Sequence, residues 1–147
     1  MIIDQLTEIR NLTKEELYRL LNEAPDTETR FLRQMQINTG RDIYDFFNRD
    51  SEEICGLVID GRPIYIAAVM LNKEGRHIFW TVVNSNVKHK ITLSNSVRRN
   101  LKNWLEKFGT LYATMGKDNK TNMRWVEWLG FNMINEDEDT ITYKIGV

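Results

Sequence analysis

The side chains that could bind a metal or act as nucleophiles are few and far apart. The chain has two histidines, His77 and His89, and one cysteine, Cys55, so it lacks the closely spaced ligands of a zinc site. The acidic run Glu136–Asp139 has neither the glycine nor the spacing of a calcium loop, and a solvated turn is its simplest interpretation. No Gly-x-Ser-x-Gly, Walker or dinucleotide-binding motif is present. We therefore predict no metal site, and Cys55 is most simply a small buried apolar residue.

A basic segment is the clearest candidate for ligand binding. Lys88, His89 and Lys90 are consecutive, and no Asp or Glu occurs from Asn84 through Leu105. Because this segment directly precedes a predicted helix, whose free amides and dipole attract anions, its charge suits a phosphate group. A solvated basic loop is the more common explanation of such a run, and both interpretations stay open here.

The composition is that of an ordinary globular protein. Twenty basic and 21 acidic residues give a net charge of −1, which argues against a general nucleic-acid binder. No segment approaches the roughly 18 consecutive apolar residues of a membrane span. The first residues carry no secretion signal, so we expect an intracellular protein. The length of 147 residues suits one domain with one core, spanning residues 1–147.

The first third of the sequence favours helices. Thr13 and Glu16 have the spacing of a capping box, and the leucines that follow form an apolar stripe, which predicts a helix over Lys14–Glu23. Pro25 then prevents its continuation. From Glu28 to about Asn48 the apolar spacing is again helical, with a break at Thr39-Gly40 that predicts two short helices.

The middle of the sequence favours strands. Ile54–Ile59 and Ile64–Leu71 are rich in β-branched residues, and Asp60-Gly61 between them is a strong hairpin signal. After a second turn, His77–Val83 has the same character. These segments predict three antiparallel strands in a meander.

The last third alternates between helix and strand. An amphipathic helix follows the polar stretch 84–90 and ends at Gly109. The remaining predicted elements are a strand over Leu111–Met115, a helix over Asn122–Leu129, and strands over Phe131–Ile134 and Thr140–Ile145.

This order predicts an α/β (α+β) fold with a mixed, mostly antiparallel sheet and helices on both faces. The long helix should connect two parallel strands by a right-handed crossover. We therefore expect Phe79–Val83 and Leu111–Met115 to be neighbouring parallel strands that diverge toward their C-terminal ends.

The order of elements resembles that of the GNAT (acyl-CoA N-acyltransferase) superfamily. In that family an Asn opens a short helix that ends in Gly-Phe, and the segment Asn119–Phe131 has this form. The ending Arg124–Phe131 and the hairpin Ile59–Ile64 are also similar to those of small GNAT-like proteins of bacteriophages, which include an internal core protein of short-tailed coliphages. The resemblance covers about Asp42 to Val147. The aromatic and aliphatic residues of the ending are most simply core residues: Trp125, Val126, Trp128, Leu129 and Phe131.

The resemblance implies an acetyl-CoA site. The pantetheine arm would pair with the strand edge from Trp80 to Asn84, and the pyrophosphate would face the segment from Val87 to Ser94. The cofactor-binding residues that it implies are therefore Thr81, Val83, Lys88, His89, Lys90, Ser94 and Asn119.

The sequence departs from the family pattern in the residues that carry the chemistry. The usual phosphate loop contains glycines, whereas no glycine lies between Arg76 and Phe108. The position of the general-acid tyrosine in many relatives is Val126 here, and no Glu occupies the central strands. The nearest candidates for a general base are His77, His89 and Asp118, and the proton donor would be Tyr112 or solvent.

Two functions of different class follow. In the first, the chain is an acetyl-CoA-dependent N-acetyltransferase that acts on a small-molecule or protein amine, mainly by positioning the reactants. In the second, it is a catalytically silent GNAT fold that serves as a phage virion or host-interaction protein. Neither function involves nucleic acid or a membrane. The expected location is the host cytoplasm, or the virion in the second case.

Overall fold

The protein folds around a seven-stranded sheet whose strand order is β1-β2-β3-β4-β5-β7-β6. The computed structural model describes residues 7–24, 29–30, 32–33, 42–84 and 90–146. All neighbouring strands are antiparallel except β4 and β5. The strands are β1 (Thr7–Arg10), β2 (Ser51–Ile59), β3 (Arg62–Leu71), β4 (His77–Val83), β5 (Thr110–Gly116), β6 (Asn132–Glu136) and β7 (Thr140–Gly146).

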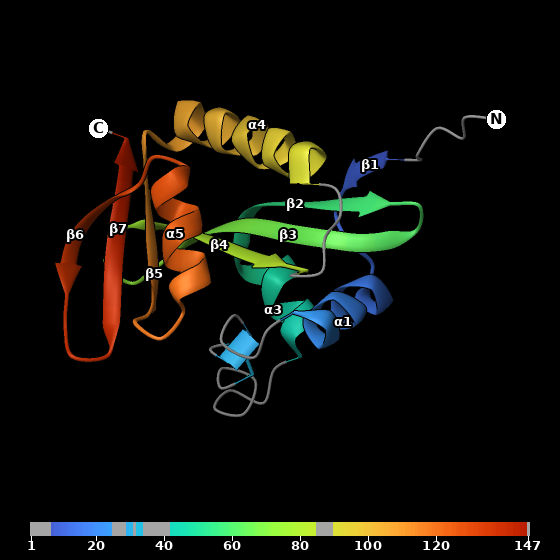
Figure 1. The fold of residues 1–147 in the computed structure, drawn as a ribbon, viewed down its shortest axis with the longest axis horizontal. Coiled ribbons are helices and arrows are strands. Elements are labelled where there is room, and N and C mark those ends of the chain that lie inside the picture. The colour runs from blue at the N-terminus through green and yellow to red at the C-terminus, as the bar shows by residue number, and fades with distance from the viewer. Residues whose placement is uncertain (1–6, 25–28, 31, 34–41, 85–89, 147) are drawn as a thin grey trace.

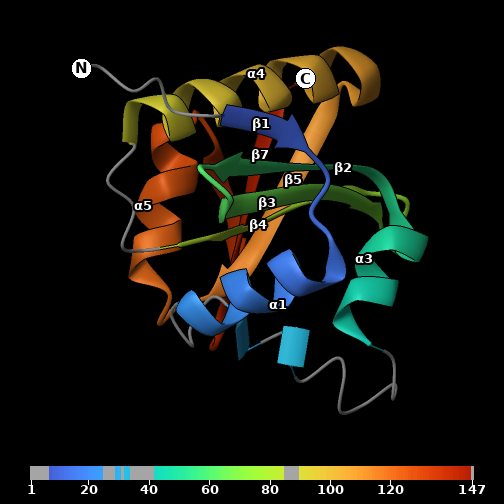
Figure 2. The ribbon, with the colours of Figure 1, turned by 90° about the vertical axis from the view of Figure 1, so that its right-hand side faces the viewer.

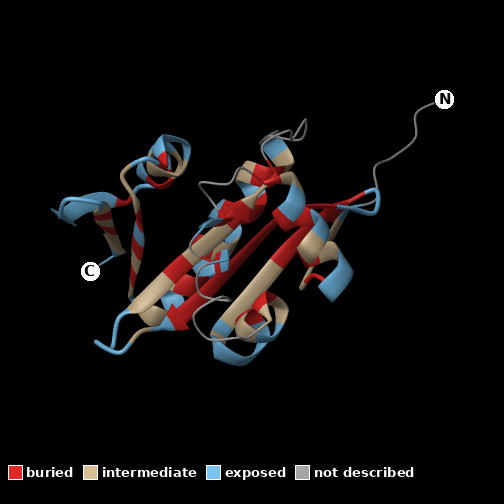
Figure 3. Cartoon of the chain, turned by 90° about the horizontal axis from the view of Figure 1, so that it is seen from below, coloured by how far each residue is buried: buried red, intermediate tan, exposed pale blue. Residues whose placement is uncertain are grey.

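Helices cover both faces of this sheet, as predicted (Figures 1 and 2). The labelled helices are α1 (Lys14–Glu23), α3 (Ile43–Asp50), α4 (Lys90–Phe108) and α5 (Lys120–Trp128). Buried leucines of α1 and Phe47 of α3 form one core layer with Val58 and Ile66 of the sheet. On the opposite face, residues of α4 and α5 form the other layer. Figure 3 shows that the buried positions concentrate in the strands between these two layers.

Local sequence signals account for several element boundaries. The capping box is present, because the Thr13 side chain accepts from the Glu16 amide while the Glu16 carboxylate accepts from the Thr13 amide. α1 has the predicted bounds. Asp60 and Gly61 both have positive φ, 51° and 76°, as the predicted hairpin turn between β2 and β3 requires.

The predicted parallel pair is confirmed. α4 connects β4 to β5, and these strands share a single pair of residues in register, Ile78 with Tyr112. Beyond this pair the two strands separate (Figure 1). The sheet is therefore open between the C-terminal parts of β4 and β5.

Strand β1 is an element that the sequence analysis missed. Its four residues pair antiparallel with β2, with Arg10 opposite Gly56. A Cβ atom at Gly56 would lie 2.7 Å from the Leu12 side chain and 2.8 Å from the Arg10 carbonyl oxygen, so the glycine allows this close approach. The predicted break at Thr39-Gly40 lies outside the described residues.

Two details of the C-terminal segment differ from the predictions. α5 begins at Lys120 rather than Asn122, because Asn119 caps it two residues earlier. Val126, Leu129 and Phe131 are buried as predicted, but Trp128 is 47% exposed and Trp125 is only partly buried. The expectation of a core position was thus wrong for Trp128, whose ring stacks on Trp125 instead.

Candidate active site

The opening between β4 and β5 forms a cleft of about 290 Å³. Its walls come from the two separating strands, from α5 and from the starts of β7 and the β3–β4 turn. The lining residues are Asn72, Ile78, Phe79, Trp80, Thr81, Ala113, Thr114, Met115, Gly116, Asn119, Asn122, Val126 and Thr140. The cleft is thus mostly apolar, with neutral polar groups at several positions. Trp80 contributes to its wall without filling it.

The edge of β4 that faces the cleft offers backbone groups for binding. Every residue of β4 pairs with β3 on the other edge, from His77 opposite Leu71 to Val83 opposite Tyr65. On the cleft side, Ile78 is the one residue of β4 in register with β5 among the described residues. Amide and carbonyl groups farther along this edge can therefore pair with an extended ligand.

Asn119 joins the cleft to α5. Its side-chain oxygen accepts from the Asn122 amide at 3.2 Å, and its backbone carbonyl accepts from the Met123 amide. The residue is only 4% exposed and lines the cleft. The prediction that Asn119 caps the short helix or faces the cleft is therefore confirmed on both counts.

The other predicted cofactor-binding residues take different positions. Thr81 lines the cleft, whereas Val83 packs partly buried against the core layer under α4. Lys90 is the first residue of α4, and Ser94 lies one turn later and is half-buried. Lys88 and His89 lie outside the described residues.

None of the three predicted catalytic residues that the structure describes lines the cleft. His77 lies at the start of β4, where its Nε2 is 3.2 Å from a Glu52 carboxylate oxygen and the centre of its ring is 4.5 Å from that of Phe108, with the two rings tilted by 32°. Tyr112 lies on β5, and the Arg76 guanidinium carbon lies over its ring, 4.6 Å from the ring centre of Tyr112.

Asp118 precedes the α5 cap and pairs with Arg30 at 2.5 Å. The hydrogen bond from Arg30 holds the pKa of the Asp118 carboxyl below its usual range. An ionised, paired carboxylate of low pKa is a weak general base at neutral pH. The structure thus gives no direct support to catalysis by these three residues, and their role stays a prediction.

Several polar residues of the cleft were not identified from sequence. Asn72 is held by its own turn, where its side-chain oxygen accepts from the Glu74 and Arg76 amides. Thr114 bonds to Thr142 across β5 and β7. Such residues are common in turns and strands, so only the strand order could have indicated their position at the cleft.

A buried contact fixes the chain where β4 ends. The Asn84 side chain donates to a Glu23 carboxylate oxygen at 2.5 Å, and the Asn84 amide donates to the Ile64 carbonyl at 2.9 Å. Asn84 is only 2% exposed. Arg62 is 3.4 Å from the same Glu23 oxygen. This contact connects the end of α1 to the segment that leads into the basic start of α4.

Other kinds of site receive no support from the described residues. No group of three or more His, Cys, Asp or Glu side chains among them could hold a metal ion. No helix in the described ranges is long and apolar enough to cross a membrane.

Comparison with known proteins identifies the fold. No family model matches the chain, and no curated protein matches it. Among solved structures, the chain is similar to the PaiA N-acetyltransferase from Thermoplasma acidophilum in complex with coenzyme A. The TM-score is 0.68 and the sequence identity is 14%, and the match covers 97% of this chain and 99% of that chain. It is also similar to a GNAT-family acetyltransferase from Bacillus anthracis, with a TM-score of 0.67 and 16% identity over 95% of this chain and 94% of that one.

A third similar structure is the ribosomal-protein-S18-alanine N-acetyltransferase from Escherichia coli, with a TM-score of 0.64 and 17% identity over 96% of this chain and 94% of that chain. The chain therefore has the GNAT fold, as the sequence predicted. Identities this low show the fold alone. These three structures do not test the resemblance to bacteriophage proteins.

Proposed function

We propose that this protein is an acyl-CoA-dependent N-acyltransferase that transfers an acetyl group to an amine in the cleft between β4 and β5. The observation that carries this proposal is the separation of these strands beyond Ile78, which opens a cleft of about 290 Å³ beside the part of β4 that is not in register with β5. The similar structures are acetyltransferases, and one of them is a complex with coenzyme A. Fold similarity alone does not establish the activity, so the proposal depends on the site.

The residues of the site fit an acyl-CoA. The β4 edge at Thr81 can pair with the amides of a pantetheine arm, and the apolar part of the lining can surround its methylene groups. The start of α4 supplies free helix amides next to Lys90, with Lys88 preceding it in the sequence. Acetyl-CoA would bring to this site a thioester whose carbonyl carbon an amine can attack.

The transfer reaction balances in atoms and charge without a charged side chain among the described residues of the cleft. The amine nitrogen forms a bond to the carbonyl carbon, the carbon–sulfur bond breaks, and the proton lost by nitrogen reaches the departing thiolate directly or through water. Among the lining residues that the structure describes, none has an acidic, basic, cysteine or tyrosine side chain. The protein would therefore act by holding the neutral amine and the thioester together, an effect that can supply much of the acceleration of a reaction between two molecules.

The basic segment at the start of α4 provides the test. Replacing Lys88 and Lys90 together with glutamate should weaken acetyl-CoA binding more than tenfold in calorimetric titration, because two reversed charges near a pyrophosphate exceed the roughly 1.4 kcal/mol that a tenfold change represents. The matched control reverses two exposed charges elsewhere, at Lys73 and Arg49, and should leave binding unchanged. No heat of binding by the wild-type protein at millimolar acetyl-CoA would refute the proposal.

The second candidate is a catalytically silent GNAT fold that serves as a phage virion or host-interaction protein. It is favoured by one observation, the absence of glycine between Arg76 and Phe108, where the family has its phosphate loop. Under this alternative the wild-type protein and the double lysine variant behave alike in the titration, since neither binds acetyl-CoA.

A further inference from the structure

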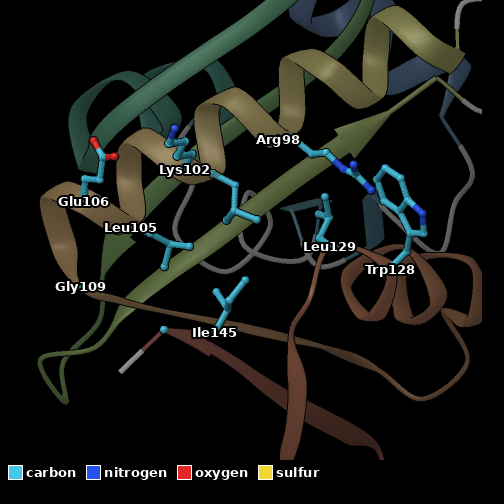
Figure 4. Close-up of a pocket in the computed structure, with 10 residues that line it drawn as sticks. Arg98, Lys102, Leu105, Glu106, Gly109, Trp128, Leu129 and Ile145 are labelled. Carbon is cyan, nitrogen blue, oxygen red and sulfur yellow. The ribbon is translucent and has the colours of Figure 1, made fainter.

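A second and larger hollow, of about 530 Å³, lies at the C-terminal half of α4 and shares no residue with the cleft. Its floor is apolar, and in Figure 4 the side chains of Leu105, Leu129 and Ile145 lie around it. Arg98, Lys102 and Glu106 of α4 form part of its rim. We call this hollow the α4 groove.

The outward side of α4 beside the groove is basic. Arg98, Arg99 and Lys102 are exposed there, and so is Lys107, which pairs with Glu53; Glu106 is the one carboxylate of α4 itself. The Arg98 guanidinium lies 4.1 Å from the centre of the exposed Trp128 ring and so extends the basic rim over an aromatic wall. A ligand of the groove should therefore combine apolar side chains with negative charge.

The outermost strand of the sheet, β6, carries apolar side chains on the surface. All five of its residues are exposed, including Met133 at 52% and Ile134 at 45%. Ile134 is the extra residue of a bulge, because Met133 is opposite Tyr143 and Asn135 is opposite Thr142. Exposed apolar residues on an edge strand commonly mark a contact surface.

The acidic turn that follows β6 supplies the negative charge. Glu136, Asp137, Glu138 and Asp139 are consecutive and exposed. Asp137 maintains the turn by accepting from the Asp139 and Thr140 amides. The segment from Met133 to Asp139 thus joins two exposed apolar residues to four carboxylates, which is the chemistry that the α4 groove and its rim would complement.

We propose that two copies of this chain form a dimer in which the acidic turn of each copy lies on the basic rim of the other copy's α4 groove. In Figure 1 the β6–β7 turn is at the lower left of the molecule, and the C-terminal end of α4 is at the upper left, inward of β6. A two-fold axis perpendicular to the sheet, located between the two β6 strands and level with the middle of each, places one copy upside down beside the other. Each turn then meets the opposite groove, and Met133 and Ile134 of the two copies lie at the centre.

This arrangement avoids contacts between like charges. Where the two β6 strands run antiparallel about Ile134, Asn132 of one copy lies near Glu136 of the other. An amide can donate to that carboxylate, whereas two carboxylates would repel each other. The contact is isologous, so every favourable charge pair occurs twice and the assembly closes at two copies.

The test is the mass of the full-length protein by sedimentation velocity across a range of protein concentrations. We expect a dimer whose dissociation constant rises with salt, because the contacts between turn and rim are partly exposed. Two variants, Glu136→Lys with Glu138→Lys and Arg98→Glu with Lys102→Glu, should each raise the dissociation constant more than tenfold. All four substitutions combined in one chain should restore the dimer, since each contact then has the opposite but complementary charges.

Two further variants separate this inference from a general effect of charge. Ile134→Lys places a charge at the centre of the contact and should also give monomers. Lys73→Glu with Glu74→Lys exchanges charges on the exposed β3–β4 turn and should leave the dimer intact. A wild-type monomer at every concentration overturns the inference, and so does a dimer that neither charge-reversed pair weakens. The experiment uses no acyl donor, so its result is independent of the proposed function.

Discussion

Replacing Asn119 with alanine and, separately, with serine distinguishes its structural contribution from its contribution to binding. Asn119 both caps α5 and lines the cleft. The amides of the first turn of α5 have no partner within the helix, and the Asn119 side chain satisfies that of Asn122 at 3.2 Å. Alanine removes this acceptor, while serine keeps an oxygen at the same position of the cap.

The expected magnitude follows from this contact. Loss of an N-cap side chain typically costs about 1 kcal/mol, whereas serine and asparagine are nearly equivalent caps. Asn122 is partly buried, so water compensates only in part for the lost acceptor. We therefore expect Asn119→Ala to lower the free energy of unfolding by about 1 kcal/mol and the melting temperature by about 3 °C. Asn119→Ser should remain within a few tenths of a kcal/mol of the wild type.

Urea denaturation followed by circular dichroism measures the stability of each variant, and titration with acetyl-CoA measures binding. If the amide of Asn119 contacts the acyl donor, both variants bind it more weakly although only the alanine variant is destabilised. Equal stability of all three proteins would refute the capping role. Equal loss in both variants would show that burial of the amide, rather than the cap, stabilises this site.

Other contacts give predictions for stability and binding. Hydrogen bonding to Arg10 lowers the pKa of Glu16 from 4.5 to about 2. The contact between Glu16 and Arg10 therefore stabilises the fold above pH 4.5, and this stabilisation is lost as the pH falls toward 2. The melting temperatures of Arg10→Gln and the wild type should differ at neutral pH and converge near pH 2. Replacing Asn84 with Leu leaves the Glu23 carboxylate without its amide donor, and should lower the melting temperature and weaken acetyl-CoA binding. The double variant Asn84→Asp with Glu23→Gln should recover part of the stability and part of the binding. Gly56→Ala should destabilise the protein in urea denaturation by 1 kcal/mol or more, of the order of other overpacking substitutions, because the new methyl group would meet β1 backbone.

The elements that were predicted correctly are those whose signals are local. The capping box at Thr13 and Glu16 and the Asp60-Gly61 turn act within a few residues, so the sequence alone indicates them. The parallel pairing of β4 and β5 followed from the length of the helix between them and the handedness rule for such crossovers. β1 could not be identified in this way. It is short and mostly exposed, and it is a strand only because β2 lies beside it.

The same distinction between local and long-range signals applies to the residues of the candidate site. The location of the cleft depends on strand order, which the sequence predicts, and Thr81 and Asn119 were therefore placed correctly beside it. The catalytic candidates depended on which face and which end of a strand each side chain occupies. His77 precedes the Ile78–Tyr112 pair, where β4 and β5 are still together, so it lies before the point at which the cleft opens. One or two residues along a strand are enough to remove a side chain from the cleft.

Val126 bears on how the leaving group could be protonated, because it lines the cleft. It is 1% exposed and lines the cleft, so the position where related proteins have a tyrosine does face the proposed reaction site. A valine there cannot protonate a thiolate, and the other described residues of the lining have apolar or neutral polar side chains. A thiol is a much stronger acid than an alcohol, so the departing thiolate needs less assistance from an acid than an alkoxide would. An acyltransferase with this lining would depend on positioning and on the neutral form of its amine, and its rate should rise with pH toward the pKa of that amine rather than that of a protein side chain.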